Sequence, residues 1–301
     1  MQFYEDILGL IGNTPLVRLN RMTRDIKATV LAKMENLNPG FSVKDRIGIS
    51  MIEAAEREGK LKPGGTVVEA TSGNTGIGLA IAAAVKGYKC IFVMTDKASV
   101  EKSRYLKALG ADVVITPVSA KPGTPDHYVS TAQRIAAETP NSFYPDQYSH
   151  PANPEAHYRS TGPEIWQQTE GKVTHFVAGI GTGGTISGTG RYLKEKNPAV
   201  TIIGAQPAEG SSIPGIRKWP EAYLPKIFDA RRVDRVESVT QQEAEDTMRQ
   251  LAREEGIFGG VSSGGACAVA LRIAQEVRDA TIVFVVCDRG DRYLSTGVFP
   301  A

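Results

Sequence analysis

One lysine and three glycine-rich loops are the parts of this 301-residue chain whose residue types and spacing could do chemistry. Lys44 lies in the run Asn38-Pro-Gly-Phe-Ser-Val-Lys44-Asp-Arg46, where Ser42 and Asp45 resemble a helix-capping box. This spacing predicts Lys44 in the first turn of a helix, where the helix dipole disfavours a positive charge. If partly buried there, the lysine should have a lowered pKa and an available neutral amine, as Schiff-base formation requires. A lone lysine of this kind is more often solvated and paired with a carboxylate.

The first loop, Thr71-Ser-Gly-Asn-Thr-Gly76, follows a predicted strand and precedes an alanine-rich helical segment. A strand–loop–helix unit directs backbone N–H groups and the positive end of a helix dipole at one point. That point favours a phosphate or a carboxylate. The serine, asparagine and threonine side chains add hydrogen-bond donors. The same pattern also fits an ordinary turn with a helix cap.

The second loop, Gly181-Thr-Gly-Gly-Thr185, also lies between a predicted strand and a helix. With Gly179 it spells G-x-G-x-x-G, the pattern of a dinucleotide site. The next strand has no acidic residue to bind a ribose before Glu209, and no lysine follows Gly184 as in a P-loop. The loop is therefore predicted to bind a phosphate without the residues that a nucleotide requires.

The third loop, Gly260-Val-Ser-Ser-Gly-Gly265, matches the nucleophile elbow of α/β-hydrolases. Those enzymes need an acidic residue and then a histidine later in the chain, and here the last histidine is His175. We therefore interpret Ser262 and Ser263 as hydrogen-bonding groups at a helix start. No metal site is expected, because the four histidines lack metal-ligand spacing: His127, His150, His157 and His175.

A Schiff-base lysine and two anion-binding loops together are what pyridoxal 5'-phosphate (PLP) requires. This cofactor needs an amine for its aldehyde, a cradle for its phosphate and a second anion site for the substrate carboxylate. Lys44, the 181–185 loop and the 71–76 loop could supply these three groups.

The elements that must position these groups alternate along the chain. The predicted strands span 29–33, 66–70, 90–94, 112–116, 175–180, 201–205 and 281–286. The predicted helices span 45–57, 76–86, 100–109, 126–138, 162–168, 186–195, 241–255 and 265–277. This order favours an α/β protein with mainly parallel sheets covered on both faces. The length favours two domains, with the proline-rich segment 144–154 as the better boundary.

Composition argues against several kinds of partner. Lys and Arg total 35 against 33 Asp and Glu, a formal charge of +2, so we expect neither nucleic acid nor an anionic membrane. No apolar run approaches the roughly 18 residues of a membrane span. Cys90, Cys267 and Cys287 form no C-x-x-C pair, which fits a reducing compartment and predicts a cytoplasmic protein.

The order of these motifs resembles that of the cysteine synthases and cystathionine β-synthases, the β-family or fold type II PLP enzymes. The resemblance spans nearly the whole chain and rests on Ile11-Gly-Asn-Thr-Pro-Leu16, Ser42-Val-Lys-Asp-Arg46, Thr71-Ser-Gly-Asn-Thr-Gly76, Gly181-Thr-Gly-Gly-Thr185 and Ser262-Ser-Gly264. It implies two doubly wound α/β domains of the tryptophan synthase β type, with PLP in the cleft between them, and a homodimer. Residues 36–147 are expected to form a smaller mobile domain, and 1–35 plus 148–301 a larger PLP-phosphate-binding domain.

The resemblance also implies a role for each motif residue. Lys44 is expected to be the Schiff-base lysine and the base at the substrate Cα. Asn74 is expected to bind the cofactor ring oxygen, and Ser262 to face the pyridine nitrogen. The cofactor phosphate is expected to be held by Gly181, Thr182, Gly183, Gly184 and Thr185. The substrate carboxylate is expected to be held by Thr71, Ser72, Gly73, Thr75 and Gln147.

The two halves of the chain resemble different branches of this family. Cysteine synthase B is the closer match for the C-terminal half, notably Ser211-Ser-Ile-Pro-Gly-Ile-Arg-Lys-Trp219 and Cys287-Asp-Arg-Gly-Asp-Arg-Tyr293. In relatives, the loop at the position of Arg217–Trp219 helps to admit thiosulfate or, in some, O-phosphoserine, so Arg217 is expected to bind a dianionic substrate. Lys218 stands where a second arginine is commoner. The N-terminal half, with Pro39-Gly-Phe-Ser-Val-Lys-Asp-Arg-Ile47, is more like a cystathionine β-synthase core.

These observations predict a PLP-dependent transferase or lyase of cysteine and amino-acid biosynthesis. In the expected β-replacement, O-acetylserine or O-phosphoserine loses its β-substituent. Sulfide or thiosulfate then adds, giving cysteine or S-sulfocysteine. Three alternatives are cystathionine β-synthase activity on serine and homocysteine, a serine or threonine dehydratase on the same fold, and a non-catalytic protein that binds a small carboxylate. Lys44 argues against the last alternative, because a binding protein does not need a Schiff-base lysine.

Overall fold

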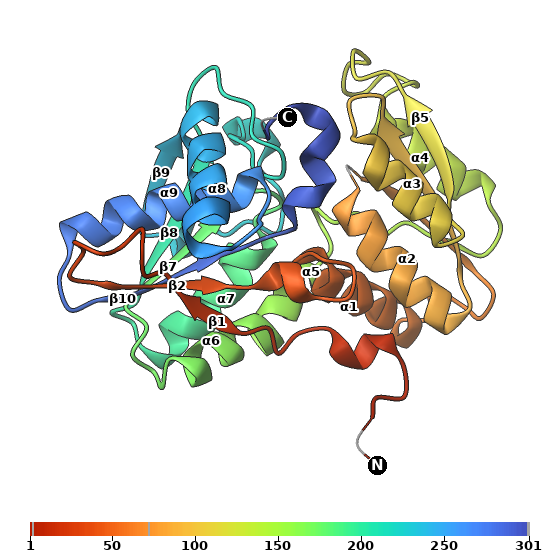
Figure 1. Cartoon of the computed structure of the whole chain (residues 1–301). Helices are drawn as coiled ribbons and strands as arrows, with labels where there is room; N and C mark the ends of the chain where they lie inside the picture. The colour runs from red at the N-terminus through yellow and green to blue at the C-terminus, as the bar shows by residue number, and fades with distance from the viewer. Residues whose placement is uncertain (2, 72, 300–301) are drawn as a thin grey trace. The chain divides into compact units, whose positions relative to one another are not determined.

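The computed structural model of the chain describes residues 1, 3–71 and 73–299, and it divides into two compact units (Figure 1). Unit 1 consists of Met1–Ile11 and Asn38–Ala152, and unit 2 of Gly12–Leu37 and Asn153–Ala301. The domain boundaries predicted from the sequence were 36 and 147, with residues 1–35 in the larger domain. The first eleven residues group with unit 1 because the 3-10 helix η1 (Ile7–Leu10) packs against helix α2 (Asn74–Lys86).

Unit 1 is built on a four-stranded sheet in which every pair is parallel, in the order β5-β4-β3-β6. Its strands are β3 (Thr66–Ala70), β4 (Lys89–Thr95), β5 (Asp112–Thr116) and β6 (Ser142–Phe143). Its longer helices are α1 (Lys44–Arg57), α2, α3 (Val100–Ala108) and α4 (Tyr128–Glu138). Since β3 is buried along its whole length, both faces of this sheet are covered.

Unit 2 is built on a six-stranded sheet in the order β1-β2-β10-β7-β8-β9, in which only β1 is antiparallel to its neighbour. Its strands are β1 (Leu16–Arg18), β2 (Thr29–Lys33), β7 (His175–Gly179), β8 (Thr201–Pro207), β9 (Arg235–Val239) and β10 (Thr281–Val285). Its longer helices are α6 (Gly162–Gln168), α7 (Gly184–Lys196), α8 (Gln241–Glu255) and α9 (Val261–Glu276). The short helix α5 (Ala152–Ala156) and the π-helical turn η3 (His157–Thr161) precede α6.

The central strand β10 shows that this second sheet is also covered on both faces. Ile282 and Phe284 belong to the core cluster that includes residues of α8 and α9, whereas Val283 and Val285 belong to a second cluster with Phe176. Neighbouring residues of a strand point to opposite faces. Each face of the sheet therefore has its own hydrophobic core, and Figure 1 shows α8 and α9 lying together over this sheet.

The predicted α/β class with mainly parallel sheets is confirmed. Every strand and helix predicted from the sequence is present, with ends shifted by a few residues at most. The prediction missed β1, β6, β9 and α5. Of these, β6 has only two residues, and β9 alternates apolar with charged side chains at the edge of its sheet, so neither has the apolar run that marked the other strands.

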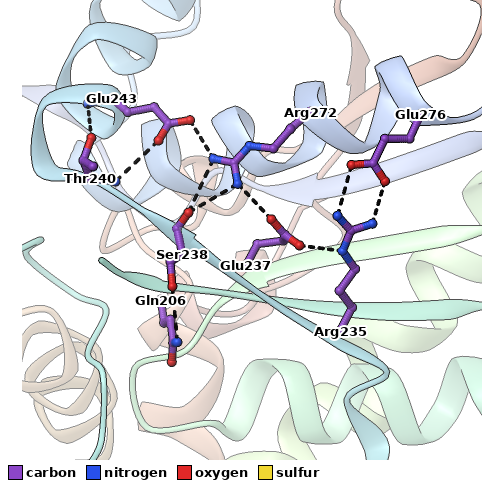
Figure 2. Close-up of polar contacts among 8 residues, drawn as sticks. All are labelled: Gln206, Arg235, Glu237, Ser238, Thr240, Glu243, Arg272 and Glu276. Atoms are coloured by element: carbon purple, nitrogen blue, oxygen red, sulfur yellow. Dashed lines mark hydrogen bonds and ion pairs between the residues drawn. The ribbon is translucent and has the colours of Figure 1, made fainter. Parts of the chain in front are cut away.

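Ion pairs cover the edge strand β9 (Figure 2). Arg235 contacts both carboxylate oxygens of Glu276, at 2.6 and 3.0 Å, and also pairs with Glu237. Arg272 of α9 bridges Glu237, at 2.8 Å, and Glu243 of α8, at 2.7 Å. Charged side chains on an edge strand oppose edge-to-edge pairing with another chain, and here they also tie β9 to both helices.

Glu243 has a second role at the start of α8. The Thr240 side chain accepts the backbone N–H of Glu243, and the Glu243 carboxylate accepts the backbone N–H of Thr240, which is a complete capping box.

Of the helices formed by residues 1, 3–71 and 73–299, none has the length and apolar character that crossing a bilayer requires.

Candidate active site

Helix α1 begins at Lys44, as predicted, but the expected capping box of Ser42 and Asp45 is not formed. Val43 is the N-cap, and its helical backbone conformation turns the chain before a side-chain cap could form. The hydroxyl of Ser42 instead accepts the N–H of Lys44, at 3.2 Å, and donates to Asp45 Oδ1, at 3.4 Å. The Asp45 carboxylate also accepts the N–H of Gly40. Buried polar contacts thus hold the backbone on both sides of Lys44.

Two glycines bring the start of α1 against α2. A Cβ atom on Gly78 would lie 2.6 Å from the carbonyl oxygen of Lys44, and one on Gly48 would collide with the backbone of Gly78. Contacts this close leave no room for a side chain at either glycine. The backbone of Lys44 is therefore held beside the first two turns of the helix that follows the 71–76 loop.

The 71–76 loop is ordered by its own first residue. The N–H of Thr71 donates to Val93 O of the neighbouring strand, at 3.0 Å. The hydroxyl oxygen of Thr71 accepts the N–H groups of Gly73, at 3.1 Å, and Gly76, at 3.3 Å. Gly73 has φ +127°, a conformation that side chains rarely adopt, and it is the N-cap of α2. Ser72 lies outside the described residues.

The structure brings Gln147 to this loop, 72 residues along the chain from Thr75. The Thr75 hydroxyl donates to Gln147 Oε1 at 2.7 Å, and Gln147 Nε2 donates to Ala70 O at 3.4 Å. Both side chains are buried. Asn74 is the first residue of α2, at the positive end of the helix dipole. Unit 1 thus gathers four of the expected carboxylate ligands, Thr71, Gly73, Thr75 and Gln147, around one helix start.

In unit 2, the 181–185 loop leads directly into α7. Gly183 is the N-cap, with φ +85°, and the helix starts at Gly184. A Cβ on Gly181 would lie 2.5 Å from the carbonyl oxygen of Gly215, and one on Gly184 would collide with the Asn153 side chain. The bare backbone at the start of a 13-residue helix leaves N–H groups without intrahelical partners, so the loop fits a phosphate group.

The threonines of this loop are held by the segment that precedes α6. Thr182 Oγ1 accepts two hydrogen bonds, one from Nδ2 of the buried Asn153, at 3.2 Å, and one from the backbone N–H of Gly184, at 3.3 Å. Thr185 Oγ1 lies 3.2 Å from Nε2 of the buried His157. The sequence analysis assigned no site role to either residue, because Asn153 lies in the proline-rich segment 144–154 and His157 was considered only as a metal ligand.

The other ring nitrogen of His157 lies 2.9 Å from Thr161 Oγ1. Both residues belong to the π-turn η3, and such turns are frequent at functional sites. The sequence Thr161-Gly-Pro-Glu164 has the pattern of a helix start capped by threonine, but Thr161 has a helical backbone and makes no capping bond. Instead, the ammonium group of the buried Lys33 donates a hydrogen bond to Glu164 Oε2, at 2.6 Å.

Ser262 lies in the first turn of α9, 3% exposed. A Cβ on Gly215 would lie 3.4 Å from Ser262 Oγ. Because Gly215 also abuts Gly181, this glycine joins Ser262 to the 181–185 loop. The structure thus gathers Ser262 and the expected phosphate ligands within unit 2.

The segment 211–219 packs on the same loop. The backbone N–H of Arg217 donates to Ile180 O, at 2.8 Å, and the Trp219 indole N–H donates to Gly181 O, at 2.7 Å. The Arg217 guanidinium lies 5.6 Å from the centre of the Trp219 ring. Lys218, in contrast, pairs with Glu209 at the surface, at 2.8 Å.

Two charged residues of unit 1 that the sequence analysis did not select lie next to the 71–76 loop. Lys102 of α3 is buried, and a Cβ on Gly73 would lie 2.6 Å from its Cδ atom. Glu69 of β3 is 1% exposed, and burial raises the pKa of its carboxyl to about 8. The sequence does contain a signal for Glu69. It is the only charged residue of the predicted strand Thr66-Val-Val-Glu-Ala70, whose other residues are apolar or small.

Comparison with known proteins gives concordant matches. The chain matches the family model described as pyridoxal-phosphate dependent enzyme over residues 7–288. It is 55% identical over 296 residues to cysteine synthase B of Pseudomonas aeruginosa, with 98% of each protein covered. It is 45% identical over 300 residues to cystathionine beta-synthase of Apis mellifera, covering 95% of this chain and 60% of that protein. The structure matches O-acetylserine sulfhydrylase isoform 3 of Entamoeba histolytica with a TM-score of 0.91 at 36% identity, covering 100% of this chain and 92% of that one.

Proposed function

We propose, for a chain that belongs to the family of pyridoxal-phosphate dependent enzymes, that the reaction is β-replacement on an activated serine. The chain is a PLP-dependent, cysteine-synthase-like enzyme of the fold type II class. The proposal concerns its substrates and the roles of its residues. It is carried by one observation: each unit gathers part of the expected residue set at the N-terminus of a long helix, α2 in unit 1 and α7 in unit 2.

PLP, when bound, supplies an electron sink that acidifies the Cα proton of an amino acid and promotes loss of its β-substituent. The N–H groups of residues 181–185 would bind its phosphate, Ser262 would face its ring nitrogen and Asn74 its ring oxygen. Lys44 would hold its aldehyde carbon, remove the Cα proton and later return it. The support is that the bare backbone at the start of α7 fits a phosphate, and that buried contacts hold Lys44 at the start of α1.

The substrate carboxylate would be bound by the 71–76 loop together with Gln147. The first turn of α2 offers backbone donors and a positive helix end, and the Gln147 amide lies against Thr75. The expected ligands are Thr71, Ser72, Gly73, Thr75 and Gln147. Since these groups are neutral, the carboxylate would be recognised by hydrogen bonds and by the helix dipole.

The substrates we propose are O-acetylserine or O-phosphoserine with sulfide or thiosulfate, giving cysteine or S-sulfocysteine. The cysteine synthase B relative is 55% identical, against 45% for the cystathionine beta-synthase. Arg217, exposed and lying over Trp219, would attract a dianion. The second candidate is cystathionine β-synthase activity, which the N-terminal motifs and the 45% identity favour. We further propose a cytoplasmic homodimer.

An absorbance titration of the PLP-loaded protein separates these functions. O-acetylserine is added to one sample and L-serine to another, followed by sulfide, thiosulfate or homocysteine. A visible absorbance change with O-acetylserine that sulfide or thiosulfate reverses, with formation of cysteine or S-sulfocysteine, is expected. Response to L-serine with reversal only by homocysteine would instead assign cystathionine β-synthase activity. Release of pyruvate or a related keto acid without any sulfur donor would assign a dehydratase.

A further inference from the structure

The Glu69 carboxyl is buried in a place where a charge is costly. Its strand, β3, is buried at all five positions, and Glu69 itself is 1% exposed. Burial, reinforced by the negative charge of Asp146, raises the pKa of the Glu69 carboxyl to about 8. A buried ionisable group with no compensating contact would be strongly destabilising, so its hydrogen bonds indicate what this residue does.

Those hydrogen bonds hold one turn of backbone. Glu69 Oε2 accepts the N–H of Asp146 at 2.8 Å, and the carboxyl also accepts the backbone N–H of Gln147. Asp146 has φ +50°, in the left-handed region that non-glycine residues seldom occupy. Its carbonyl oxygen accepts the N–H groups of Ser149 and His150, both at 2.9 Å. A single buried carboxyl therefore binds two successive amides of a tight, unfavourable turn.

That turn places the Gln147 side chain. Gln147 lies outside the sheet, because β6 ends at Phe143 after only two residues. The Gln147 amide nevertheless meets the Thr75 hydroxyl at 2.7 Å and Ala70 O at 3.4 Å. Ala70 directly follows Glu69, so the same stretch of chain that starts the 71–76 loop also holds the distant residue that joins it.

We propose that Glu69 is a positioning residue that fixes Gln147 beside Thr75 for binding of the substrate carboxylate. This inference rests on the proposed function, and Glu69 itself does not touch substrate. Replacing one carboxyl oxygen by an amide NH₂ group would weaken the hold of residue 69 on the turn, because that group donates hydrogen bonds instead of accepting them. The turn would then relax from the left-handed conformation, and the Gln147 amide would leave Thr75. The substrate carboxylate would lose a ligand while Lys44 kept its place.

Several ionisable groups lie around this site, including His150 of the same turn, which interacts with Asp146. The negative charge of Asp146 raises the pKa of the Glu69 carboxyl, and Glu69 in turn raises the pKa of Tyr144. Tyr128 of α4 and Tyr148 also raise the pKa of Tyr144. Because the ionised carboxylate accepts two N–H groups better than the protonated acid, the turn should be held more firmly as pH rises through about 8.

The test compares Glu69→Gln with wild type in the PLP-loaded protein. Glu138→Gln, which changes a carboxylate 63% exposed on α4 of the same unit, serves as the matched control. Amide hydrogen exchange of a peptide covering residues 144–150 is expected to be faster in Glu69→Gln alone. The KM for O-acetylserine is expected to rise by about tenfold or more, with kcat changed by less than about threefold, as for loss of a buried hydrogen-bond acceptor of the turn.

Two further measurements test the same inference independently. The pH profile of kcat/KM should contain a transition near pH 8 in wild type that Glu69→Gln lacks. Glu69→Asp, which keeps a carboxyl but shortens its reach, should show the same faster exchange and raised KM, and it replaces Glu69→Gln if that variant does not fold. Unchanged exchange of residues 144–150, or a fall in kcat with KM unaltered, would overturn the inference. Failure of the proposed function would appear differently, as a wild-type protein that turns over no serine derivative, and amide exchange would still decide whether Glu69 holds the turn.

Discussion

At the scale of single residues, the proposed chemistry would depend on side chains that polar contacts hold in place. Lys44 starts α1 between Ser42 and Asp45, and Thr75 and Gln147 bond to each other within unit 1. These contacts reduce the number of conformations that each group can adopt before substrate binds. A preorganised group loses less entropy on binding than a mobile one.

Replacing Lys44 by alanine tests the central assignment. Lys44→Ala should lower turnover of O-acetylserine by at least about 10³-fold, because no other group is proposed to move the Cα proton. It should also alter the visible absorbance of the PLP-loaded protein. Lys60→Ala, at a lysine 62% exposed in the same unit, should change neither. A Lys44→Ala protein with full turnover would exclude every catalytic role proposed above.

The raised pKa of Glu69 also makes stability depend on pH. This carboxyl titrates near 4.5 in the unfolded chain and near 8 in the folded protein. Between these values the folded state keeps a proton that the unfolded state has lost. The contribution of Glu69 to the free energy of unfolding therefore falls as pH rises, by up to about 1.4 kcal/mol per pH unit.

Glu69→Gln should remove this decline, since an amide does not titrate. Urea unfolding of the PLP-free wild type and variant, at about pH 5.5 and about pH 7.5, measures the difference. The variant should gain stability relative to wild type at the higher pH. Equal pH dependence of the two proteins would show that the carboxyl titrates normally despite its burial.

At the scale of elements, close helix packing and charge networks hold neighbouring helices and strands together. Gly48 and Gly78 let α1 and α2 approach until backbone touches backbone, next to Lys44. In unit 2, Arg235 and Arg272 tie β9 to α8 and α9. The first contact is steric and tolerates no added atom, whereas the second is electrostatic and depends on salt.

Gly78→Ala should separate α1 from α2, because its Cβ would lie 2.6 Å from the carbonyl oxygen of Lys44. We expect a loss of about 1–3 kcal/mol in the free energy of unfolding and a lower kcat. The matched control is Ala84→Gly, at an exposed position of the same helix, which should cost about 1 kcal/mol and leave kcat unchanged. Similar kcat values in both variants would mean that the packing does not position Lys44.

Arg272→Gln should destabilise unit 2 through the lost pairs with Glu237 and Glu243. Because Arg272 is 35% exposed, the expected loss is only about 1 kcal/mol, and most of it should vanish in about 1 M salt. Chemical unfolding at low and high salt measures this change. The isolated pair of Arg134 with Glu138 provides the comparison, and Arg134→Gln should cost about 0.5 kcal/mol or less. Equal losses in both variants would show that the network adds nothing beyond isolated pairs.

At the scale of the whole molecule, the chain passes between the two units three times, after residues 11, 37 and 152. Each unit nevertheless has its own sheet and its own hydrophobic clusters. Closure of the smaller domain on substrate, which the family resemblance implies, stays a prediction.

A homodimer is expected in solution. The segment 3–10 of unit 1 exposes large apolar side chains that a second copy could cover: Phe3, Tyr4, Ile7 and Leu10. Light scattering at micromolar concentration should give about 65 kDa, twice the 32.3 kDa of one chain. A mass near that of a single chain would contradict this expectation.

The sequence by itself determined the α/β class, the approximate places of the strands and helices, and the glycine-rich loops between them. Those features are local, because strands show as apolar runs and an anion-binding turn shows as glycines between a strand and a helix. The resemblance of the motifs placed the chain in its family, and the family match confirmed it.

Only the tertiary structure decided which distant residues meet. Gln147 reaches Thr75, Glu69 lies under the turn at Asp146, and His157 approaches Thr185. It also decided that Ser42 and Asp45 bind backbone beside Lys44 instead of forming a capping box. None of the three distant pairs is visible in a local pattern. Each contact depends on strand order and helix packing, which follow from burying apolar surface over the whole of a unit.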